Sequence, residues 1–138
     1  RQRCTGPSLK LDAPQQVGVD PLLILAVMAV ESRFNPIAES IMGAKGLMQV
    51  IPKHHHDKFV EHGGTDSVLD PMTNILVGAR ILKEYIRRTG SVEAGLQLYS
   101  GGLSDVSGQY AQKVTAEMDR LRQTVSKYER QPRKDSAA

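Results

Sequence analysis

Glu31 is the residue whose type and position most clearly suggest chemistry. It directly follows the apolar run from Leu22 to Val30, near the C-terminal end of the helix predicted over residues 21–33. Apolar surroundings disfavour the ionised carboxylate and raise its pKa, and the negative end of the helix dipole acts in the same direction. Both effects keep the carboxyl group protonated near neutral pH, as a general acid requires. These arguments alone leave open a glutamate that turns into solvent where the helix emerges.

The consecutive histidines His54 to His56, with His62 nearby, invite a metal-site interpretation. Residues that share a helix face are three or four positions apart, so consecutive residues of a helix point in different directions. We therefore predict that these histidines lie on the surface, where adventitious nickel or zinc could bind. We expect neither a metal site nor a cofactor. The single cysteine, Cys4, allows no internal disulfide and is predicted to be an unpaired thiol near the chain end.

The elements that position Glu31 are predicted to be helices, because strand-like alternation is nearly absent. Asp20 and Asp70 each precede a proline, a pattern typical of a helix N-cap followed by the first helical residue. The predicted helices run over residues 21–33, over a short stretch from Pro52, over 71–88, from a cap at Ser91 through Tyr99, and over about 108–128. The first is apolar on every side through Val30, which is typical of a buried central helix.

Two later helices each carry an apolar stripe that can pack on this central helix. The stripes are Ile75, Gly78, Ile81, Leu82, Tyr85 and Ile86 in the helix over 71–88, and Tyr110, Val114, Leu121, Val125 and Tyr128 in the last helix. The sequence therefore predicts an all-α fold, with one globular domain of about five to seven helices around a buried central helix. We assign residues 1–128 to this domain and residues 129–138 to a polar, frayed tail.

Composition excludes several function classes. The chain has 138 residues, of which 40% are hydrophobic and 24% are charged, as in an ordinary single domain. Its net charge of +3 comes largely from residues 120–134, so we do not infer nucleic-acid binding. The run from Leu22 to Val30 is far shorter than the roughly 20 residues of a transmembrane helix. It follows Pro21 rather than a basic stretch, so it is not a signal peptide either; we expect any export signal to have been removed before Arg1.

Several motifs around Glu31 occur in a characteristic order. They are Glu31-Ser32, Ser40, the segment Gly43 to Pro52, Asp70-Pro71, Asn74-Ile75 with Gly78, and Tyr99 to Gly102. This set, over residues 17–114, resembles the soluble lytic transglycosylase family, whose SLT domain is lysozyme-like. In that family the glutamate matching Glu31 protonates the glycosidic oxygen between N-acetylmuramic acid and N-acetylglucosamine. It then acts as a base while the muramic C6 hydroxyl attacks C1, which gives a 1,6-anhydro product.

The resemblance also implies a set of substrate-binding residues, namely Ser40, Gly46, Met48, Gln49, Tyr99 and Ser100. Ser40 matches a serine thought to hold the substrate's acetamido group, and its alternative is a hydroxyl that bonds the local backbone. Gln49 matches a glutamine of the sugar cleft, but a polar side chain that satisfies buried backbone groups has the same pattern. Met48 matches a cleft methionine, with ordinary core packing as the alternative.

For the remaining residues the alternatives are also structural. Gly46 allows the backbone to approach the sugar or simply to turn. Tyr99 matches a tyrosine close to the catalytic carboxyl, and its hydroxyl could orient Glu31; a half-buried aromatic at a helix end is the alternative. The chain departs from the family at Ser100, where asparagine is usual, and at Gly101, where alanine is usual. These departures affect the floor of the cleft and substrate preference rather than the acid.

The function predicted from this resemblance is a peptidoglycan lytic transglycosylase that works without metal or cofactor. One alternative is a lysozyme-type muramidase, which would need a second carboxylate; Glu39 is the first candidate, while Asp57, Glu61 and Asp66 are predicted to be solvated. Another is a catalytically weak module that binds peptidoglycan or docks to a secretion or conjugation assembly. We expect a monomer in the periplasm or cell envelope that acts on glycan strands.

Overall fold

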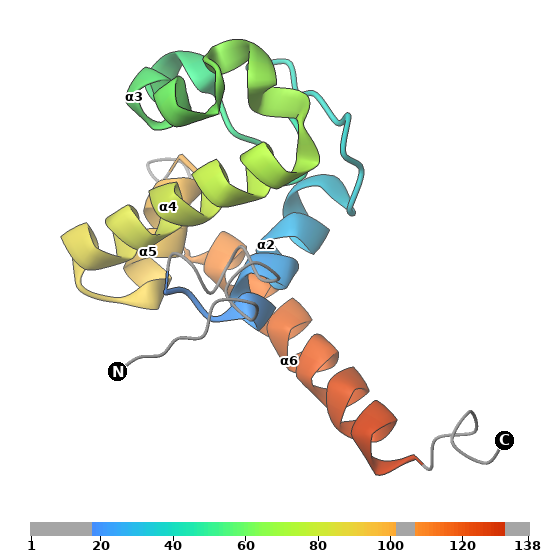
Figure 1. Cartoon of the computed structure of the whole chain (residues 1–138). Helices are drawn as coiled ribbons and strands as arrows, with labels where there is room; N and C mark the ends of the chain where they lie inside the picture. The colour runs from blue at the N-terminus through green and yellow to red at the C-terminus, as the bar shows by residue number, and fades with distance from the viewer. Residues whose placement is uncertain (1–17, 102–106, 132–138) are drawn as a thin grey trace, which may run out of the picture.

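The computed structural model describes residues 18–101 and 107–131, which form helices joined by turns (Figure 1). The elements are α2 (Pro21–Ser32), η2 (Pro52–His54), α3 (His56–Phe59), η3 (Val60–His62), η4 (Thr65–Leu69), α4 (Pro71–Thr89), α5 (Val92–Tyr99) and α6 (Gln109–Arg130). Strand-type pairing in these residues is limited to isolated bridges that join Lys45 to Glu39 and to Val50. The all-α prediction is confirmed.

Helix α2 is the buried helix that the sequence predicts. The Asp20 side chain accepts a hydrogen bond from the Leu22 backbone N–H at 2.9 Å, and Pro21 occupies the first turn. The core residues of α2 are Leu23, Ile24, Ala26, Val27 and Met28. The helix ends where Arg33 adopts a left-handed conformation with φ of 52°, so Glu31 lies in its last turn.

Helices α4 and α5 form a closely packed pair. The Asp70 side chain caps α4 through the Thr73 N–H at 2.9 Å, and the left-handed Gly90 ends the helix. Gly95 of α5 lies directly against α4, because a Cβ there would be 2.8 Å from the Ile86 Cα. The predicted bounds of both helices hold to within a residue.

Helix α6 has two halves with different surroundings. Its first half packs against α2 and buries Ala111 and Val114, whereas its second half extends beyond the other helices (Figure 1). Val125 is 42% exposed and Tyr128 is 70% exposed, so the predicted apolar stripe is wrong at these two positions. The frayed tail was also placed too early, because α6 continues through Arg130.

No helix in the described ranges is both long enough and apolar enough to cross a membrane. Cys4 and the remainder of the predicted tail, residues 132–138, lie outside these ranges.

Candidate active site

Glu31 is paired with a tyrosine from the far end of the chain. The Tyr110 hydroxyl, on the first turn of α6, donates a hydrogen bond to Glu31 Oε2 at 2.6 Å. Burial raises the pKa of Glu31, and the hydrogen bond from Tyr110 partly opposes this effect by stabilising the carboxylate. The pKa of the Tyr110 hydroxyl is itself raised, first by burial and then by the charge of Glu31, so Tyr110 stays a proton donor to the carboxyl group.

Sequence analysis missed this role of Tyr110. The residue was assigned to an apolar helix stripe, which is correct for its ring, since the ring packs against the core. Its polar end could not be paired with Glu31 because the two residues are 79 positions apart. A tyrosine in an otherwise apolar stripe was the available signal, because a buried phenol hydroxyl needs a partner.

Ser32 joins the end of α2 to the segment that follows it in space. Its hydroxyl lies 3.1 Å from the Met28 carbonyl oxygen and 2.8 Å from the Leu47 carbonyl oxygen. The side chain is buried. The residue after the acid therefore fixes the last turn of α2 against the Gly46–Gln49 segment.

Asn74 of α4 holds this segment from the other side and is fully buried. Its Oδ1 accepts a hydrogen bond from the Met48 N–H at 2.7 Å. Its Nδ2 donates to the carbonyls of Lys45 and Val68, both at 2.8 Å. One side-chain amide thus bonds three backbone groups, two of them in the segment between α2 and η2. The sequence singled out Asn74 only as part of a motif and did not assign it this role.

This arrangement gives Gly46 and Met48 structural roles. Gly46 has φ of +81°, as its turn alternative expects, and a Cβ there would lie 2.4 Å from Asn74 Nδ2, so its missing side chain makes room for the asparagine. An approach of the Gly46 backbone to a sugar stays a prediction. Met48 is 0% exposed, and its side chain lies against Gly78. In this conformation Met48 is part of the core and cannot contact a substrate with its side chain.

Ser40 and Gln49 both form hydrogen bonds with backbone groups, which was the structural alternative to sugar binding for each residue. Ser40 Oγ accepts a hydrogen bond from the Ala44 N–H at 3.1 Å. Gln49, with a strained φ of 52°, donates from Nε2 to the carbonyls of Ala38 at 3.1 Å and Gly46 at 3.0 Å. These bonds leave the Gln49 Oε1 and the Ser40 hydroxyl proton uncommitted among the contacts found in the described ranges, so sugar binding by both residues stays a prediction.

Tyr99 does not orient Glu31 with its hydroxyl, and that part of the prediction is wrong. The Tyr99 hydroxyl donates to the Met48 carbonyl at 2.7 Å. Burial, followed by the negative charge of Glu31, raises the pKa of Tyr99, so the ring still lies within electrostatic range of the acid. Ser100 ends α5, and its hydroxyl donates to the Gln97 carbonyl at 2.8 Å. A substrate contact by Ser100 stays a prediction.

Two of the predicted site residues line one pocket. Gln49 and Tyr99 contribute to a cavity of about 270 Å³, next to His54, His55 and Gly101. Its volume lies just below the range for small-molecule sites, roughly 300–1,000 Å³. The lining of this cavity combines an aromatic residue, Tyr99, with the polar residues Gln49, His54 and His55.

Comparison with known proteins identifies the family. The family model described as "Transglycosylase SLT domain" matches residues 9–122. The chain belongs to this family.

Relatives of this SLT domain include the "Transglycosylase" of Enterobacteria phage PRD1, which is 36% identical over 69% of this chain and 34% of the phage protein. "Membrane-bound lytic murein transglycosylase C" of Haemophilus influenzae (strain PittEE) is 42% identical over 51% of this chain and 21% of that protein. The SLT domain thus spans about a third or less of these relatives.

Among solved structures, the X-ray structure of the lytic transglycosylase Slt inactive mutant from Pseudomonas aeruginosa superposes with a TM-score of 0.71 at 19% identity. The match covers 88% of this chain and 24% of that one. At this identity the similarity establishes the shared fold, and the lysozyme-like, all-α prediction is confirmed.

The histidine run of this SLT domain is not one helix, so the geometric premise of the sequence analysis was wrong. His54 ends η2, His55 separates the two helices with φ of −139°, and His56 begins α3. Burial, followed by the charge of Lys58, lowers the pKa of His55. Within residues 18–101 and 107–131, no three histidine, cysteine or acidic residues are grouped as a metal site requires.

Three of the four carboxylates considered for a second catalytic role, Glu39, Asp57 and Glu61, form ion pairs. Glu39 lies 2.7 Å from Lys45, and its side chain is 56% exposed. Asp57 lies 3.6 Å from Lys58, and Glu61 lies 3.6 Å from Arg80. These exposed, paired carboxylates lie outside an apolar environment, unlike Glu31.

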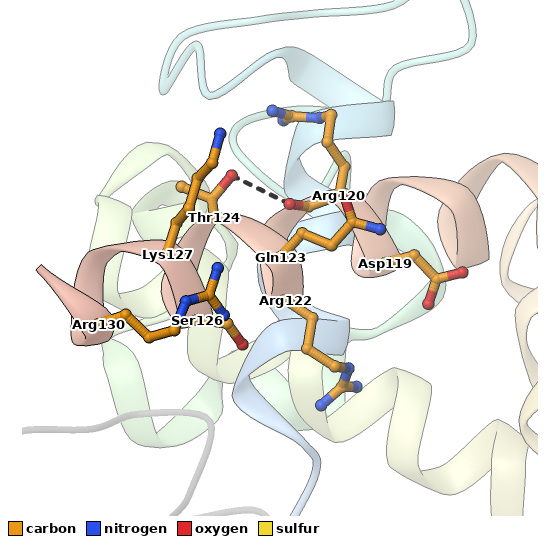
Figure 2. Close-up of a pocket in the computed structure, with 8 residues that line it drawn as sticks. All are labelled: Asp119, Arg120, Arg122, Gln123, Thr124, Ser126, Lys127 and Arg130. Atoms are coloured by element: carbon orange, nitrogen blue, oxygen red, sulfur yellow. Dashed lines mark hydrogen bonds between the residues drawn. The ribbon is translucent and has the colours of Figure 1, made fainter.

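A further hollow of about 650 Å³ lies on the projecting half of α6 (Figure 2). All of its lining residues belong to this helix, namely Asp119, Arg120, Arg122, Gln123, Thr124, Ser126, Lys127 and Arg130. Arg122 extends toward the start of α2, where its guanidinium lies 3.7 Å from the Asp20 carboxylate. None of the predicted site residues of the SLT domain borders this hollow.

Proposed function

We propose that this chain is a lytic transglycosylase that cleaves the β-1,4 bond between N-acetylmuramic acid and N-acetylglucosamine in peptidoglycan. The observation that carries this proposal is the buried Glu31 carboxyl group held by Tyr110, within a fold and family of transglycosylases. Further support comes from the solved Pseudomonas aeruginosa relative, which is an inactive mutant in which glutamate is replaced by glutamine.

In the proposed reaction Glu31 acts first as an acid. Its raised pKa favours the protonated carboxyl group, and the proton passes to the glycosidic oxygen as the bond to muramic C1 breaks. The released N-acetylglucosamine end leaves with that proton as a free hydroxyl group. Tyr110 stabilises the carboxylate that remains, because its hydroxyl donates to Oε2.

Glu31 then acts as a base. The muramic C6 hydroxyl attacks C1 and loses its proton to the Glu31 carboxylate, which closes the 1,6-anhydro ring and regenerates the acid. No water is consumed, so the two products together have the mass of the substrate. The residues proposed to hold the sugar are Gln49 and Tyr99, which share a cavity, together with Ser40 and Ser100.

The proposed location is the periplasm or cell envelope, where the substrate is found. The name "membrane-bound lytic murein transglycosylase C" of several relatives supports an envelope location. We propose that the domain acts as a monomer, without metal or cofactor. Secretion and conjugation assemblies need local cleavage of the wall, and we propose them as one context in which this activity would be used.

Mass spectrometry of the fragments released from purified peptidoglycan tests the proposal. We expect anhydro-muramic ends, which are one water lighter than hydrolysed ends. Glu31→Gln should keep the fold by circular dichroism and lose activity by at least about 10²–10⁴-fold, the usual contribution of a general acid or base. Normal turnover by this variant would refute the assignment of Glu31.

Two other outcomes have defined meanings. Reducing muramic ends would indicate a muramidase, and Glu39 would be the second carboxylate to replace. Failure of the wild-type chain to release fragments, while it still sediments with peptidoglycan, would indicate a binding module.

A further inference from the structure

A groove of about 710 Å³ runs between the end of α2 and the middle of α6. It is lined by Ala29, Val30, Arg33 and Phe34 from the first element and by Lys113, Ala116, Glu117 and Arg120 from the second. Val30 directly precedes Glu31, and Lys113 lies one helical turn after Tyr110. The groove therefore begins beside the Glu31–Tyr110 pair but contains neither residue.

The groove carries uncompensated positive charge. Arg120 is neutralised by Glu117, which accepts a hydrogen bond from Arg120 Nε at 3.0 Å. Arg33 and Lys113 have no ion pair or side-chain hydrogen bond with any other residue of the described ranges. Two free cations on opposite walls, one from each element, favour a ligand with carboxylates.

The apolar part of the groove is held in an uncommon backbone conformation. Arg33 and Phe34 have φ values of 52° and 63°, in the left-handed region that bulky residues rarely adopt. The turn is fixed by the Asn35 N–H, which donates to the Ser32 carbonyl at 3.0 Å, and by the Asn35 side chain, which accepts from the Ile37 N–H at 3.1 Å. As a result the Phe34 ring is 45% exposed beside Val30 rather than packed in the core.

We propose that this groove binds the peptide stem of peptidoglycan, and that Arg33 and Lys113 bind its carboxylates. This inference rests on the proposed function, because it assumes that the glycan reacts at Glu31. Stem peptides alternate small apolar alanine side chains with free carboxylates, and the groove offers a matching combination of small apolar walls and two cations. Neutral sugar hydroxyls have no comparable need for two free cations.

The position of the groove agrees with the connectivity of the substrate. The stem is joined to the lactyl group of muramic acid, the same sugar whose C1 reacts. One helical turn rises about 5.4 Å, and two residues of extended peptide span slightly more than this. A stem attached to a sugar at Glu31 can therefore reach Lys113 with its first residues.

The test compares two forms of one substrate. Glycan strands with intact stems are assayed beside strands from which an N-acetylmuramoyl-L-alanine amidase has removed the peptides. For Arg33→Gln/Lys113→Gln we expect kcat/KM on intact strands to fall at least about tenfold, mainly through KM, because two charge-assisted contacts are lost. On peptide-free strands the same variant should stay within about twofold of the wild type.

Lys127→Gln/Arg130→Gln is the matched control, because it removes the same charge from the projecting half of α6, outside the groove (Figure 2). We expect it to leave both rates unchanged. An equal loss on both substrates by the groove variant, or no loss on either, would overturn the proposal. Thermal unfolding of both variants checks that the fold is intact.

A binding measurement separates this proposal from the proposed function. A soluble muramyl tetrapeptide is titrated into ¹⁵N-labelled Glu31→Gln protein, and backbone amide shifts are recorded. We expect shifts at residues 29–34 and 113–120 that disappear when Arg33 and Lys113 are also replaced. The absence of shifts there rejects the stem site, whether or not the wild-type chain cleaves glycan.

Discussion

The contact between Glu31 and Tyr110 combines two opposed effects on a single carboxyl group. Burial favours the protonated form, which can donate to a leaving group, while the phenol hydroxyl favours the ionised form, which can later accept a proton. Burial is the larger effect, so the pKa of Glu31 lies above its ordinary value and the protonated form is favoured relative to that of a solvated glutamate. An acid that must later act as a base needs both forms to be accessible within one turnover.

Tyr110→Phe tests how much the Tyr110 hydrogen bond contributes to the pKa of Glu31 and to the rate. Loss of a hydrogen bond to the carboxylate raises the pKa of Glu31 further, so the limb on which activity falls with rising pH should move to higher pH. We also expect kcat to fall roughly 10–100-fold, because a hydrogen bond to a charged group is lost. Rate measurements from about pH 4 to 9 give both quantities. Tyr128→Phe, on the 70% exposed tyrosine of the same helix, is the control and should change neither.

The raised pKa of Glu31 also predicts how stability depends on pH. Below the ordinary value of 4.5 the group is mostly protonated in folded and unfolded chains, and Glu31→Gln should unfold at nearly the wild-type temperature. As the pH rises from there through the folded pKa, only the unfolded wild-type chain ionises freely, so the wild type should become less stable than the variant. Thermal unfolding at pH 4 and pH 8 measures the difference. A variant that is less stable at pH 8 than at pH 4, relative to wild type, would contradict this sign.

Single residues differed in how far the sequence could predict them. Glu31 was recognisable because its apolar neighbours in the chain are also its neighbours in space. The structural roles of Gly46 and Met48 could not be predicted, because their contacts with Asn74 and Gly78 come from a helix that follows more than twenty residues later. A motif match specifies residue types but does not distinguish a residue that touches the substrate from one that supports it.

At the scale of elements, a few side chains hold the irregular segment between α2 and η2. Asn74 extends from α4 and bonds the backbone of Lys45 and Met48. The side chains of Gln49 and Ser32 bond other backbone groups of the same segment. The segment has no hydrogen-bond ladder beyond the bridges at Lys45. Its conformation therefore depends on these side chains, and so does the position of the proposed sugar contacts.

Two glycines of this segment separate backbone strain from packing. Gly43 and Gly46 both have positive φ, at +87° and +81°, but a Cβ at Gly43 would meet no atom within 4 Å, whereas one at Gly46 would be 2.4 Å from Asn74 Nδ2. We expect Gly43→Ala to destabilise the fold by about 1 kcal/mol, from backbone strain alone. Gly46→Ala should destabilise it by about 3 kcal/mol or more, because the Asn74 hydrogen bonds are also broken. Urea unfolding of both variants measures the two losses of stability. Equal losses would show that the Asn74 hydrogen bonds do not stabilise this segment.

The helices were predictable and this segment was not, for a common physical reason. Asp20, Asp70, Ser91 and Gly90 act on backbone groups within a few residues, so their sequence positions determine helix ends locally. The segment between α2 and η2 has no such local pattern, since its partners lie on α2, α4 and α5. The same holds for the histidine run, which the turns around His55 divide between two short helices.

For the molecule as a whole, α6 belongs to the domain only in part. Its first half completes the core through Ala111 and Val114 and brings Tyr110 to Glu31, while its second half extends outward (Figure 1). A helical stripe in the sequence indicates which face can be buried, but it cannot indicate where the partner ends. This is why Val125 and Tyr128 were placed in the core.

Substitutions in the core and on the projecting half of α6 test whether only the first half of this helix contributes to stability. Leu96→Ala, at a side chain that is 1% exposed where α5 packs in the core, should destabilise the fold by about 2–5 kcal/mol. Val125→Ser and Tyr128→Ser should each change stability by no more than about 0.5 kcal/mol. Denaturant unfolding gives all three values. A loss above about 1 kcal/mol at Tyr128 would mean that the projecting half packs on another part of the chain.

The 79 residues that separate Glu31 from Tyr110 have a consequence for the order of synthesis. A ribosome makes the acid early and its phenol partner late, and the first half of α6 must emerge and dock before the pair exists. A nascent or truncated chain that stops short of Tyr110 carries the glutamate without the contact that holds it. The environment of the proposed acid is therefore complete only when the last helix has been made and has docked on α2.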